Sequence, residues 1–255
     1  MTRVATQKEK FQKFAALHVP GDPVVLFNIW DVGSAQAVLR AGAKALATGS
    51  HPVASANGWP DGEKVPIAFA LANATRIVEA VELPLTVDFE GGYSLDPVRV
   101  EANAAMLAAT GAVGCNFEDQ VIGGEGIHPL AAQCKRIAGV RRGAGDAFFI
   151  NARTDMFLKA KPEAHDLAMA DAAIERAIAF ADHGASGFFV PRLGDLKLLE
   201  RVCRASPIPV NAIAYPGAPT KKQWASAGVA RISHGPFPHA ALMKMFEEAA
   251  RTALA

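Results

Sequence analysis

Four carboxylates follow two neighbouring apolar runs of the sequence. Asp88 and Glu90 end the run that begins near residue 83, and Glu118 and Asp119 end the run at about 113–117. Asp88 and Glu90 are two positions apart, so both side chains point the same way from a strand. Clustered carboxylates raise one another's pKa, and a divalent cation removes that cost. Because neither His nor Cys accompanies these oxygens, the pattern favours Mg²⁺ or Mn²⁺ over Zn²⁺.

An arginine at the end of a further run is the candidate ligand for an anion. Arg153 follows the run at 147–151, and a guanidinium grips a carboxylate or a phosphate through two parallel hydrogen bonds. The alternative is purely structural. In that interpretation Arg153 forms an ion pair with Glu118 or Asp155, and the acids at the strand ends form salt bridges with Arg153 and Arg192 instead of holding a metal.

Two further segments could complete a site. Gly49 and Ser50 end another run and could offer backbone N–H groups to an oxyanion, although these residue types also simply form turns. The stretch His51–Pro66 is longer than the usual connection of ~2–6 residues and contains Asp61 beside Gly62. Such a segment suggests a lid over the site, and an ordinary surface loop is the alternative.

These residues need elements that bring the strand ends together. Helix-like segments end in a glycine and lead at once into an apolar run at Gly42, Gly111, Gly184 and Gly228. Glycine takes the left-handed conformation after a helix without steric cost, so the repeat marks helix-to-strand junctions. Eight strands are expected in total, at about 24–29, 44–48, 84–88, 113–117, 147–151, 186–190, 208–212 and 229–232.

Alternation of eight strands with helices predicts an α/β fold of the (β/α)8 TIM-barrel type. The whole chain, 1–255, is interpreted as one barrel domain with a short leading helix at Lys8–Leu17. A doubly wound open sheet is the alternative, but the first strand leads into NIWDVGSAQ rather than a glycine-rich phosphate turn. Barrel chemistry lies at the carboxyl ends of the strands. There we expect Trp30 and Asn211 to contact the substrate.

The composition excludes several classes of protein. Of the 255 residues, 51% are hydrophobic, and 26 basic against 25 acidic residues give a formal net charge of +1. This balance predicts no nucleic-acid partner, which would need a concentrated basic surface. No run approaches ~20 apolar residues and the start lacks a signal-peptide core, so no membrane association is expected. Three widely spaced cysteines suit a reducing compartment, and we predict a cytoplasmic protein.

Several motifs together resemble the isocitrate lyase/phosphoenolpyruvate mutase superfamily. They are FNIWDVGSAQ, TGSHPVASANGWPDG, VDFEGGYS, CNFEDQ and INARTD, spread from about residue 27 to 233. The resemblance implies a (β/α)8 barrel, a divalent metal that is usually Mg²⁺, and a small carboxylate substrate that reacts through an enolate-like species. It also implies a homo-oligomer, a dimer or a tetramer, in which the last helix, here His239–Ala253, is often exchanged between subunits.

The same resemblance implies roles for individual residues. Glu90 is the expected direct metal ligand with Asp88 behind it, and Glu118 is the acid of the next strand. Arg153 is the expected arginine that binds the substrate carboxylate, and Gly49 with Ser50 is the oxyanion turn. Asp61 is the acid of the gating loop, and Asn211 is the asparagine on the seventh strand.

The loop after the fourth predicted strand departs from the family. Gly126 stands where the isocitrate and methylisocitrate lyases carry an acidic Cys, and Gly124 stands where the mutase and phosphonopyruvate hydrolase carry a Lys. Glu125 and His128 are the titratable residues left in the loop, and His128 is a candidate catalytic acid or base. It could equally cap the entry to a helix before Pro129.

The sequence therefore favours a metal-dependent lyase or decarboxylase that cleaves a C–C bond of a small 2-oxo or 2-hydroxy carboxylic acid through an enolate. One alternative is P–C chemistry, as in phosphoenolpyruvate phosphonomutase or phosphonopyruvate hydrolase. The other is a catalytically degenerate barrel that binds a metabolite. An imine-forming aldolase is disfavoured because no Lys ends a predicted strand.

Overall fold

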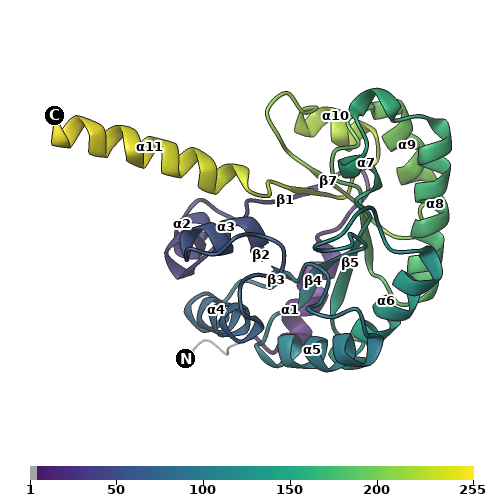
Figure 1. Cartoon of the computed structure of the whole chain (residues 1–255), viewed down its shortest axis with the longest axis horizontal. Coiled ribbons are helices and arrows are strands. Elements are labelled where there is room, and N and C mark those ends of the chain that lie inside the picture. Colours follow the sequence, from purple (N-terminus) through teal and green to yellow (C-terminus); the bar gives the residue numbers. More distant parts are fainter. Residues whose placement is uncertain (1–4) are drawn as a thin grey trace.

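The computed structural model describes residues 5–255, and its centre is an eight-stranded parallel sheet (Figure 1). The strands are β1 (Val24–Leu26), β2 (Leu46–Ala47), β3 (Leu85–Asp88), β4 (Gly114–Glu118), β5 (Phe149–Arg153), β6 (Gly187–Phe189), β7 (Val210–Ile213) and β8 (Arg231–Ser233). They pair in the order β1-β8-β7-β6-β5-β4-β3-β2. A parallel bridge between Ile29 and Thr48 joins the two remaining edges. The predicted (β/α)8 barrel and its eight strands are confirmed, with ends that differ by a few residues.

Helices follow the strands around the barrel. They are α1 (Gln7–Ala16), α2 (Val32–Arg40), α3 (Ser50–Ala56), α4 (Ile67–Ala80), α5 (Pro97–Ala109), α6 (Leu130–Ala144), α7 (Met156–Lys159), η1 (Pro162–Ala164), α8 (Leu167–Asp182), α9 (Leu196–Ala205), α10 (Lys221–Ser226) and α11 (Phe237–Leu254). The leading helix and the last helix occur where the sequence predicts them. Within residues 5–255, no helix combines the length and the hydropathy needed to cross a membrane.

The repeated glycines act as helix ends, as their positions predict. Gly42, Gly111, Gly184 and Gly228 directly follow the C-caps of α2, α5, α8 and α10. Each has a φ between +88° and +99°, in the left-handed region where a side chain would be strained. The chain can therefore turn at once into the next strand, which explains the recurrence of the pattern.

Helix α1 closes the end of the barrel at which the strands begin. Phe14 of α1 is fully buried and joins Leu26, Ala45 and Phe149 in one apolar cluster. His18 follows α1 and stacks on Phe149, with ring centroids 4.2 Å apart. Since apolar packing fills this end, the functional cavity lies at the opposite end, where the strands terminate.

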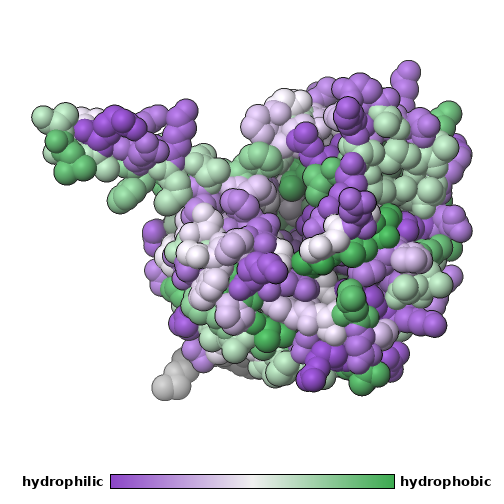
Figure 2. Space-filling model, viewed as in Figure 1, coloured by the Kyte–Doolittle hydropathy of each residue, from purple (hydrophilic) through white to green (hydrophobic). Residues whose placement is uncertain are grey.

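Helix α11 projects away from the barrel (Figure 1). Only Pro238 and His239, in its first turn, are buried, and Figure 2 shows hydrophobic side chains along the projecting arm. The large exposed apolar residues of this helix are Leu242, Met243, Met245, Phe246 and Leu254. The helix thus presents an apolar surface that its own barrel leaves uncovered.

Candidate active site

A cavity of about 450 Å³ opens at the carboxyl ends of the strands. Five of the residues selected from the sequence line it together: Gly49, Ser50, Asp61, Asp88 and Arg153. The apolar part of the lining includes Leu158, Phe189, Ile213 and Phe237. A small anionic molecule with a carbon skeleton matches such a lining, which combines charged groups with apolar surface.

Asp88 presents an unsatisfied carboxylate oxygen in this region. Its Oδ2 accepts a hydrogen bond of 3.1 Å from the backbone N–H of Ser50, whereas its Oδ1 is buried without a partner among the described residues. Burial raises the pKa of the Asp88 carboxyl above its ordinary value. A buried carboxylate oxygen without a donor is costly, so this position is suited to a cation.

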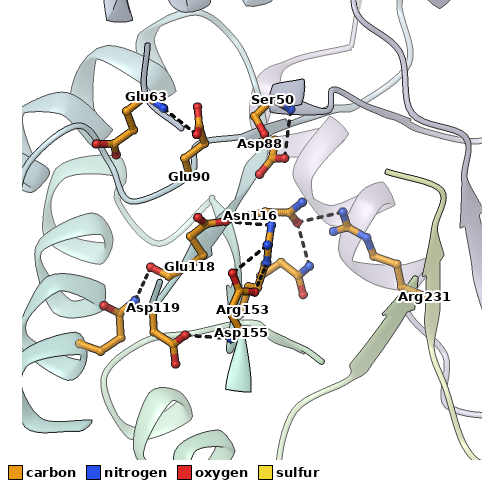
Figure 3. Close-up of polar contacts among 12 residues, drawn as sticks. Ser50, Glu63, Asp88, Glu90, Asn116, Glu118, Asp119, Arg153, Asp155 and Arg231 are labelled. Atoms are coloured by element: carbon orange, nitrogen blue, oxygen red, sulfur yellow. Dashed lines mark hydrogen bonds and ion pairs between the residues drawn. The ribbon is translucent and has the colours of Figure 1, made fainter. Parts of the chain in front are cut away.

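Glu90 and Glu118 flank Asp88, but both already have partners (Figure 3). The backbone N–H of Glu63 donates to Glu90 Oε2 over 2.8 Å, and Arg153 Nη1 lies 2.8 Å from Glu118 Oε2. Burial raises the pKa of each glutamate to about 8, and the charge of Asp88 adds to the effect at Glu90. Neither glutamate lines the large cavity, although Glu90 and Asp88 share a smaller neighbouring hollow.

Arg153 forms both ion pairs that the sequence left as alternatives. Its Nη1 pairs with Glu118, while Nε and Nη2 form a fork onto Asp155 at 2.5 and 2.8 Å. A guanidinium has five N–H groups, so two remain for a ligand in the cavity. The positive charge of Arg153 is, however, already opposed by two carboxyl groups.

The turn at Gly49 and Ser50 differs from the simple oxyanion turn expected from the sequence. The N–H of Gly49 donates to the carbonyl of Ile29 over 3.2 Å, which helps to close the barrel. The N–H of Ser50 donates to Asp88. Both backbone donors are thus engaged within the protein, and the turn serves to position Asp88.

The candidate lid is shorter than the sequence suggests, because α3 occupies the first part of the stretch 51–66. The remaining loop is attached through Glu63 to the segment that carries Glu90 and Tyr93. Its Oε1 accepts a hydrogen bond of 2.6 Å from the N–H of Tyr93, and its own N–H donates to Glu90. Asp61, which belongs to the same loop, lines the cavity.

Backbone strain is concentrated around the same site. Among the described residues, Glu63, Glu90, Tyr93 and Arg192 are the non-glycine residues with positive φ, between 49° and 72°. Such conformations cost free energy and persist where the surrounding structure enforces them, often at functional sites. Three of the four, Glu63, Glu90 and Tyr93, form the contact between the loop and the segment after β3.

Asn116 is a lining residue for which the sequence analysis gave no role. Its Oδ1 accepts hydrogen bonds from Arg231 Nη2 at 3.0 Å and from Asn151 Nδ2 at 2.9 Å (Figure 3). The carbonyl side of the amide is therefore occupied, and its NH₂ group is left to serve the cavity that Asn116 lines. The available signal was Arg231, a charged residue inside an otherwise apolar predicted strand.

Three other selected residues lie outside the cavity lining. The backbone N–H of His128 donates to the carbonyl of Asp119. The Nε2 atom of the His128 ring is buried and has no hydrogen-bond partner among the described residues. Trp30 packs edge-on against His239 of α11, with ring centroids 4.8 Å apart, and lines a separate hollow. Asn211 is buried behind Ser233, to which its Nδ2 donates over 3.2 Å.

The acidic residues do not form a complete ligand cage. Within residues 5–255, no three His, Cys, Asp or Glu side chains converge in an arrangement that could hold a metal ion. The Oδ1 of Asp88, which has no hydrogen-bond partner among the described residues, and the nearby carboxyl groups of Glu90 and Glu118 nevertheless fit a hard divalent cation, which commonly keeps several water ligands. Arg153 also acts on Asp88 and opposes its charge. Asp88 is the residue whose contacts leave an oxygen available for the cation.

The fold and the cavity define a class, a (β/α)8-barrel enzyme with an acidic, arginine-containing mouth suited to a small anion. The sequence profile of the phosphoenolpyruvate phosphomutase family matches residues 14–254. The chain belongs to this family, and thus to the isocitrate lyase/phosphoenolpyruvate mutase superfamily that its motifs resemble.

Individual relatives agree with this assignment. The uncharacterized protein Rv1998c of Mycobacterium tuberculosis is 35% identical over 93% of this chain and 87% of its own length. The 2-methylisocitrate lyase of Salmonella typhimurium is 25% identical, over 79% of this chain and 68% of its own. A crystal structure from Burkholderia cenocepacia, provisionally named a phosphonomutase, has a TM-score of 0.94 and 44% identity, with 97% of this chain and 99% of that chain covered. A solved phosphonopyruvate hydrolase of the same fold, with a TM-score of 0.82 and 19% identity over 95% of this chain and 86% of its own, is a complex with oxalate and Mg²⁺.

Proposed function

We propose that the protein is a metal-dependent lyase or decarboxylase that cleaves a C–C bond of a small 2-oxo or 2-hydroxy carboxylic acid. The observation that carries this proposal is the buried Oδ1 of Asp88, which has no hydrogen-bond partner in the described part of the chain, on a cavity that Arg153 and Asp61 also line. Asp88 supplies a site for a cation, Arg153 supplies a group that binds a carboxylate, and Asp61 supplies a titratable side chain. An enolate-forming reaction requires all three.

Mg²⁺ or Mn²⁺ is the proposed cofactor. Asp88 would hold it directly, and Glu90 and Glu118 would assist through water, since a protein donor already engages each glutamate. This order reverses the roles of Asp88 and Glu90 that the family resemblance implies. When bound, the cation supplies positive charge beside the oxygen on which the enolate charge develops.

The residues of the chain have separate tasks in the proposed reaction. The two free N–H groups of Arg153 bind the substrate carboxylate. In a 2-oxo acid, the electron pair of the breaking C–C bond passes to the 2-oxo group and forms the enolate, and the departing carbon leaves as carbon dioxide. In a 2-hydroxy acid, Asp61 takes the hydroxyl proton, the C–O group becomes the carbonyl of one product, and the electron pair passes to the carboxyl group next to the departing carbon of the other product. The enolate oxygen accepts a hydrogen bond from Asn116 Nδ2, and the enolate carbon is then protonated by Asp61 or by water. Asn211 acts through Ser233, which lines the cavity.

Two of the roles expected from the sequence receive no support from the cavity. His128 does not line it. Trp30 lines a different hollow. Catalytic work by His128 and substrate contact by Trp30 stay predictions, and we assign the proton transfer to Asp61 alone.

P–C chemistry is the second candidate because the family is described as phosphoenolpyruvate phosphomutase and the Burkholderia structure is named a phosphonomutase. Against it stands the loop after β4. Gly124 and Gly126 supply no cationic or polar side chain there, and an added Cβ at Gly126 would meet no atom within 4 Å. An added Cβ at Gly124, by contrast, would lie 2.7 Å from Cγ1 of Val121, so the loop has no room there for the missing side chain.

A turnover screen distinguishes the candidates. The purified protein is incubated with Mg²⁺ or Mn²⁺ and with oxaloacetate, 2-methylmalate, methylisocitrate or phosphonopyruvate, and the products are measured. We expect C–C cleavage of a carboxylic acid, abolished in Asp88→Asn. Turnover of phosphonopyruvate alone would favour the mutase or hydrolase. Binding of oxalate, a mimic of the enolate of pyruvate, without any turnover would favour a binding barrel.

We also propose that α11 docks on a second copy of this chain in a dimer or tetramer of single-domain barrels. An 18-residue helix extends about 27 Å, and a lone helix in water gains little stability without packing. Its exposed Met245 and Phe246, 66% and 69% accessible, need an apolar partner surface. A second copy supplies the same helix face by symmetry.

The cytoplasm is the proposed location. Cys115, Cys134 and Cys203 are all free thiols in the structure. Free cysteines are typical of proteins in a reducing compartment.

A further inference from the structure

We infer that Glu63 is a positioning residue, whose carboxylate holds the loop that carries Asp61 at the cavity. This loop lies between α3 and α4, at residues 57–66. Asp61 lines the cavity although it is exposed to solvent, so its position depends on how the loop is attached to the barrel. The part of Asp61 in proton transfer rests on the proposed function, whereas the attachment through Glu63 does not.

Glu63 provides the polar attachment of the loop tip. At the start of the loop, Trp59 packs edge-on against Phe69 of α4, with ring centroids 4.7 Å apart, and near its end Val65 is buried. In the part of the chain that the structure describes, the hydrogen bonds of residues 60–65 all involve Glu63. Asp61 therefore lies in a segment whose hydrogen bonds to the barrel converge on one residue.

Glu63 is joined to the segment after β3 in both directions. The N–H of Tyr93 donates to Glu63 Oε1 over 2.6 Å, and the N–H of Glu63 donates to Glu90 Oε2 over 2.8 Å, the contact drawn in Figure 3. All three residues have a positive φ. Such conformations cost free energy and persist where the surrounding contacts enforce them, and the two hydrogen bonds join these three residues to one another.

A buried arginine stands behind the Glu63 carboxylate. Arg136 of α6 is 3% accessible, and its Nη2 donates to the carbonyl of Gly91. Burial lowers the pKa of the Arg136 guanidinium, and the charge of Glu63 is the strongest of those that oppose this effect. Burial likewise raises the pKa of the Glu63 carboxyl, and the N–H of Tyr93 and the charge of Arg136 counteract it. Opposite charges thus strengthen the attachment.

The close approach of these groups requires the glycine at position 91. An added Cβ at Gly91 would lie 3.0 Å from Glu63 Oε1, 3.0 Å from Ile122 Cδ1 and 3.2 Å from Arg136 Nη2. Ile122, in the loop after β4, also approaches Gly62, where an added Cβ would lie 3.7 Å from Ile122 Cγ2. Three segments distant in sequence therefore meet around Glu63, and we expect loss of its carboxylate to release the loop tip.

Amide hydrogen exchange of the ligand-free protein tests the attachment. Glu63→Ala removes the carboxylate but keeps the N–H of residue 63, whose acceptor is Glu90. We expect the protection factor of this N–H to fall by about 10-fold or more, the scale of a lost hydrogen bond to a charged group. Glu63→Gln keeps an oxygen for the N–H of Tyr93 and should lose less protection. Glu82→Ala, a change at an exposed glutamate before β3, is the control and should have no effect.

Amides of β5 report on the stability of the whole barrel in the same experiment. An unaltered protection factor at residue 63 in Glu63→Ala would refute the inference. An equal fall at residue 63 and throughout β5 would also refute it, because Glu63 would then stabilise the barrel without holding the loop in particular.

A double-mutant cycle tests whether the attachment acts through Asp61. With the substrate identified in the turnover screen, Glu63→Ala should lower kcat by about 10-fold or more in the wild-type background. In the Asp61→Asn background it should lower kcat by about 2-fold or less, because changes to residues that act as a unit are not additive. Equal losses in the two backgrounds would overturn the role of Glu63 in positioning Asp61.

The two experiments separate this inference from the proposed function. Absence of turnover with every acid in the screen would refute the proposed function, while the exchange measurement would still decide whether Glu63 holds the loop. Turnover together with unaltered exchange at residue 63 in Glu63→Ala would refute the inference and leave the proposed function standing.

Discussion

Arg231 donates a hydrogen bond from Nη2 to the side-chain oxygen of Asn116 across 3.0 Å, in the interior of the barrel. Arginine can only donate, so this contact fixes which end of the Asn116 amide is the oxygen. Arg231 is fully buried, and burial lowers its pKa to about 9. The pair links β4 to β8 and directs the NH₂ group of Asn116 to the cavity.

The substitution Asn116→Asp tests this donor. It replaces the NH₂ group by a carboxylate oxygen of the same shape, so we expect turnover to fall by about 10²–10³-fold, the scale of a lost oxyanion donor. Thermal stability should hold or rise, because Arg231 gains a counter-charge. Steady-state kinetics and a melting curve give both quantities. Unchanged turnover would remove Asn116 from the reaction.

The barrel itself was predictable because its signals are local. Four of the helix-to-strand junctions combine a glycine with positive φ with an adjacent buried strand, and both leave a mark within about ten residues of sequence. Gly111 and the strand after it are an example. The ends of strands were less predictable. The run at 44–48 becomes the two-residue β2 because only Leu46 and Ala47 pair regularly with β3.

The site was only partly predictable because its contacts join distant segments. Asp88 and Arg153 were found from residue type and place alone. The attachment of Glu63 to Glu90, 27 residues away, and that of Arg231 to Asn116, 115 residues away, depend on the closed barrel. No local pattern in the sequence encodes such contacts, since each arises from tertiary packing.

Metal binding should depend more on Asp88 than on Glu90. Asp88 Oδ1 has no donor within residues 5–255, whereas the N–H of Glu63 already engages Glu90. We expect Glu90→Gln to weaken Mg²⁺ binding by about 10-fold, the scale of an outer-sphere group, and Asp88→Asn to weaken it further. Calorimetric titration of both variants with Mg²⁺ and Mn²⁺ measures this. A greater loss in Glu90→Gln would restore the order implied by the family resemblance.

Asp61→Asn should impair catalysis without affecting the fold. The change keeps the size of the side chain and removes its charge, and we expect turnover to fall by ~10²-fold or more, as for a positioned acid or base. Mg²⁺ affinity and melting temperature should hardly change, because a loop residue supports little packing. Glu125→Gln, an exposed acid in the loop after β4, is the matched control. Near wild-type turnover in Asp61→Asn would leave the loop a surface feature.

The apolar face of α11 should determine the oligomeric state. Phe246→Glu places a charge where the proposed partner copy packs, so we expect the oligomer to dissociate at micromolar concentration. Lys244→Gln changes the net charge by the same amount on the same helix and should leave assembly intact. Light scattering measures the mass of each protein. A monomeric wild type, or an unaltered mass for Phe246→Glu, would contradict the docking of α11 on a second copy.

Acid should destabilise the protein partly through His18. The ring is buried against Phe14 and Phe149. Burial, aided by the charge of Arg231, lowers the pKa of His18 from 6.5 to about 3. Between pH 6.5 and about 3, His18 is therefore protonated in the unfolded chain and neutral in the folded protein. The stabilising contribution of a neutral His18 is complete above pH 6.5 and declines as the pH falls toward 3, by up to about 1.4 kcal/mol per pH unit.

Two variants isolate this proton from the carboxylates that titrate in the same range. His18→Phe keeps an aromatic ring in the stack, and His18→Gln keeps a donor for the carbonyl of Phe14, which lies 2.9 Å from Nδ1 in the wild type. Both abolish the titration, so both should show a shallower loss of unfolding free energy between pH 6.5 and 4 in urea titrations, whatever their stability at pH 7. Slopes equal to that of the wild type in both variants would mean that His18 is protonated in the folded barrel, and the closed apolar end of the barrel would then have to admit a charge.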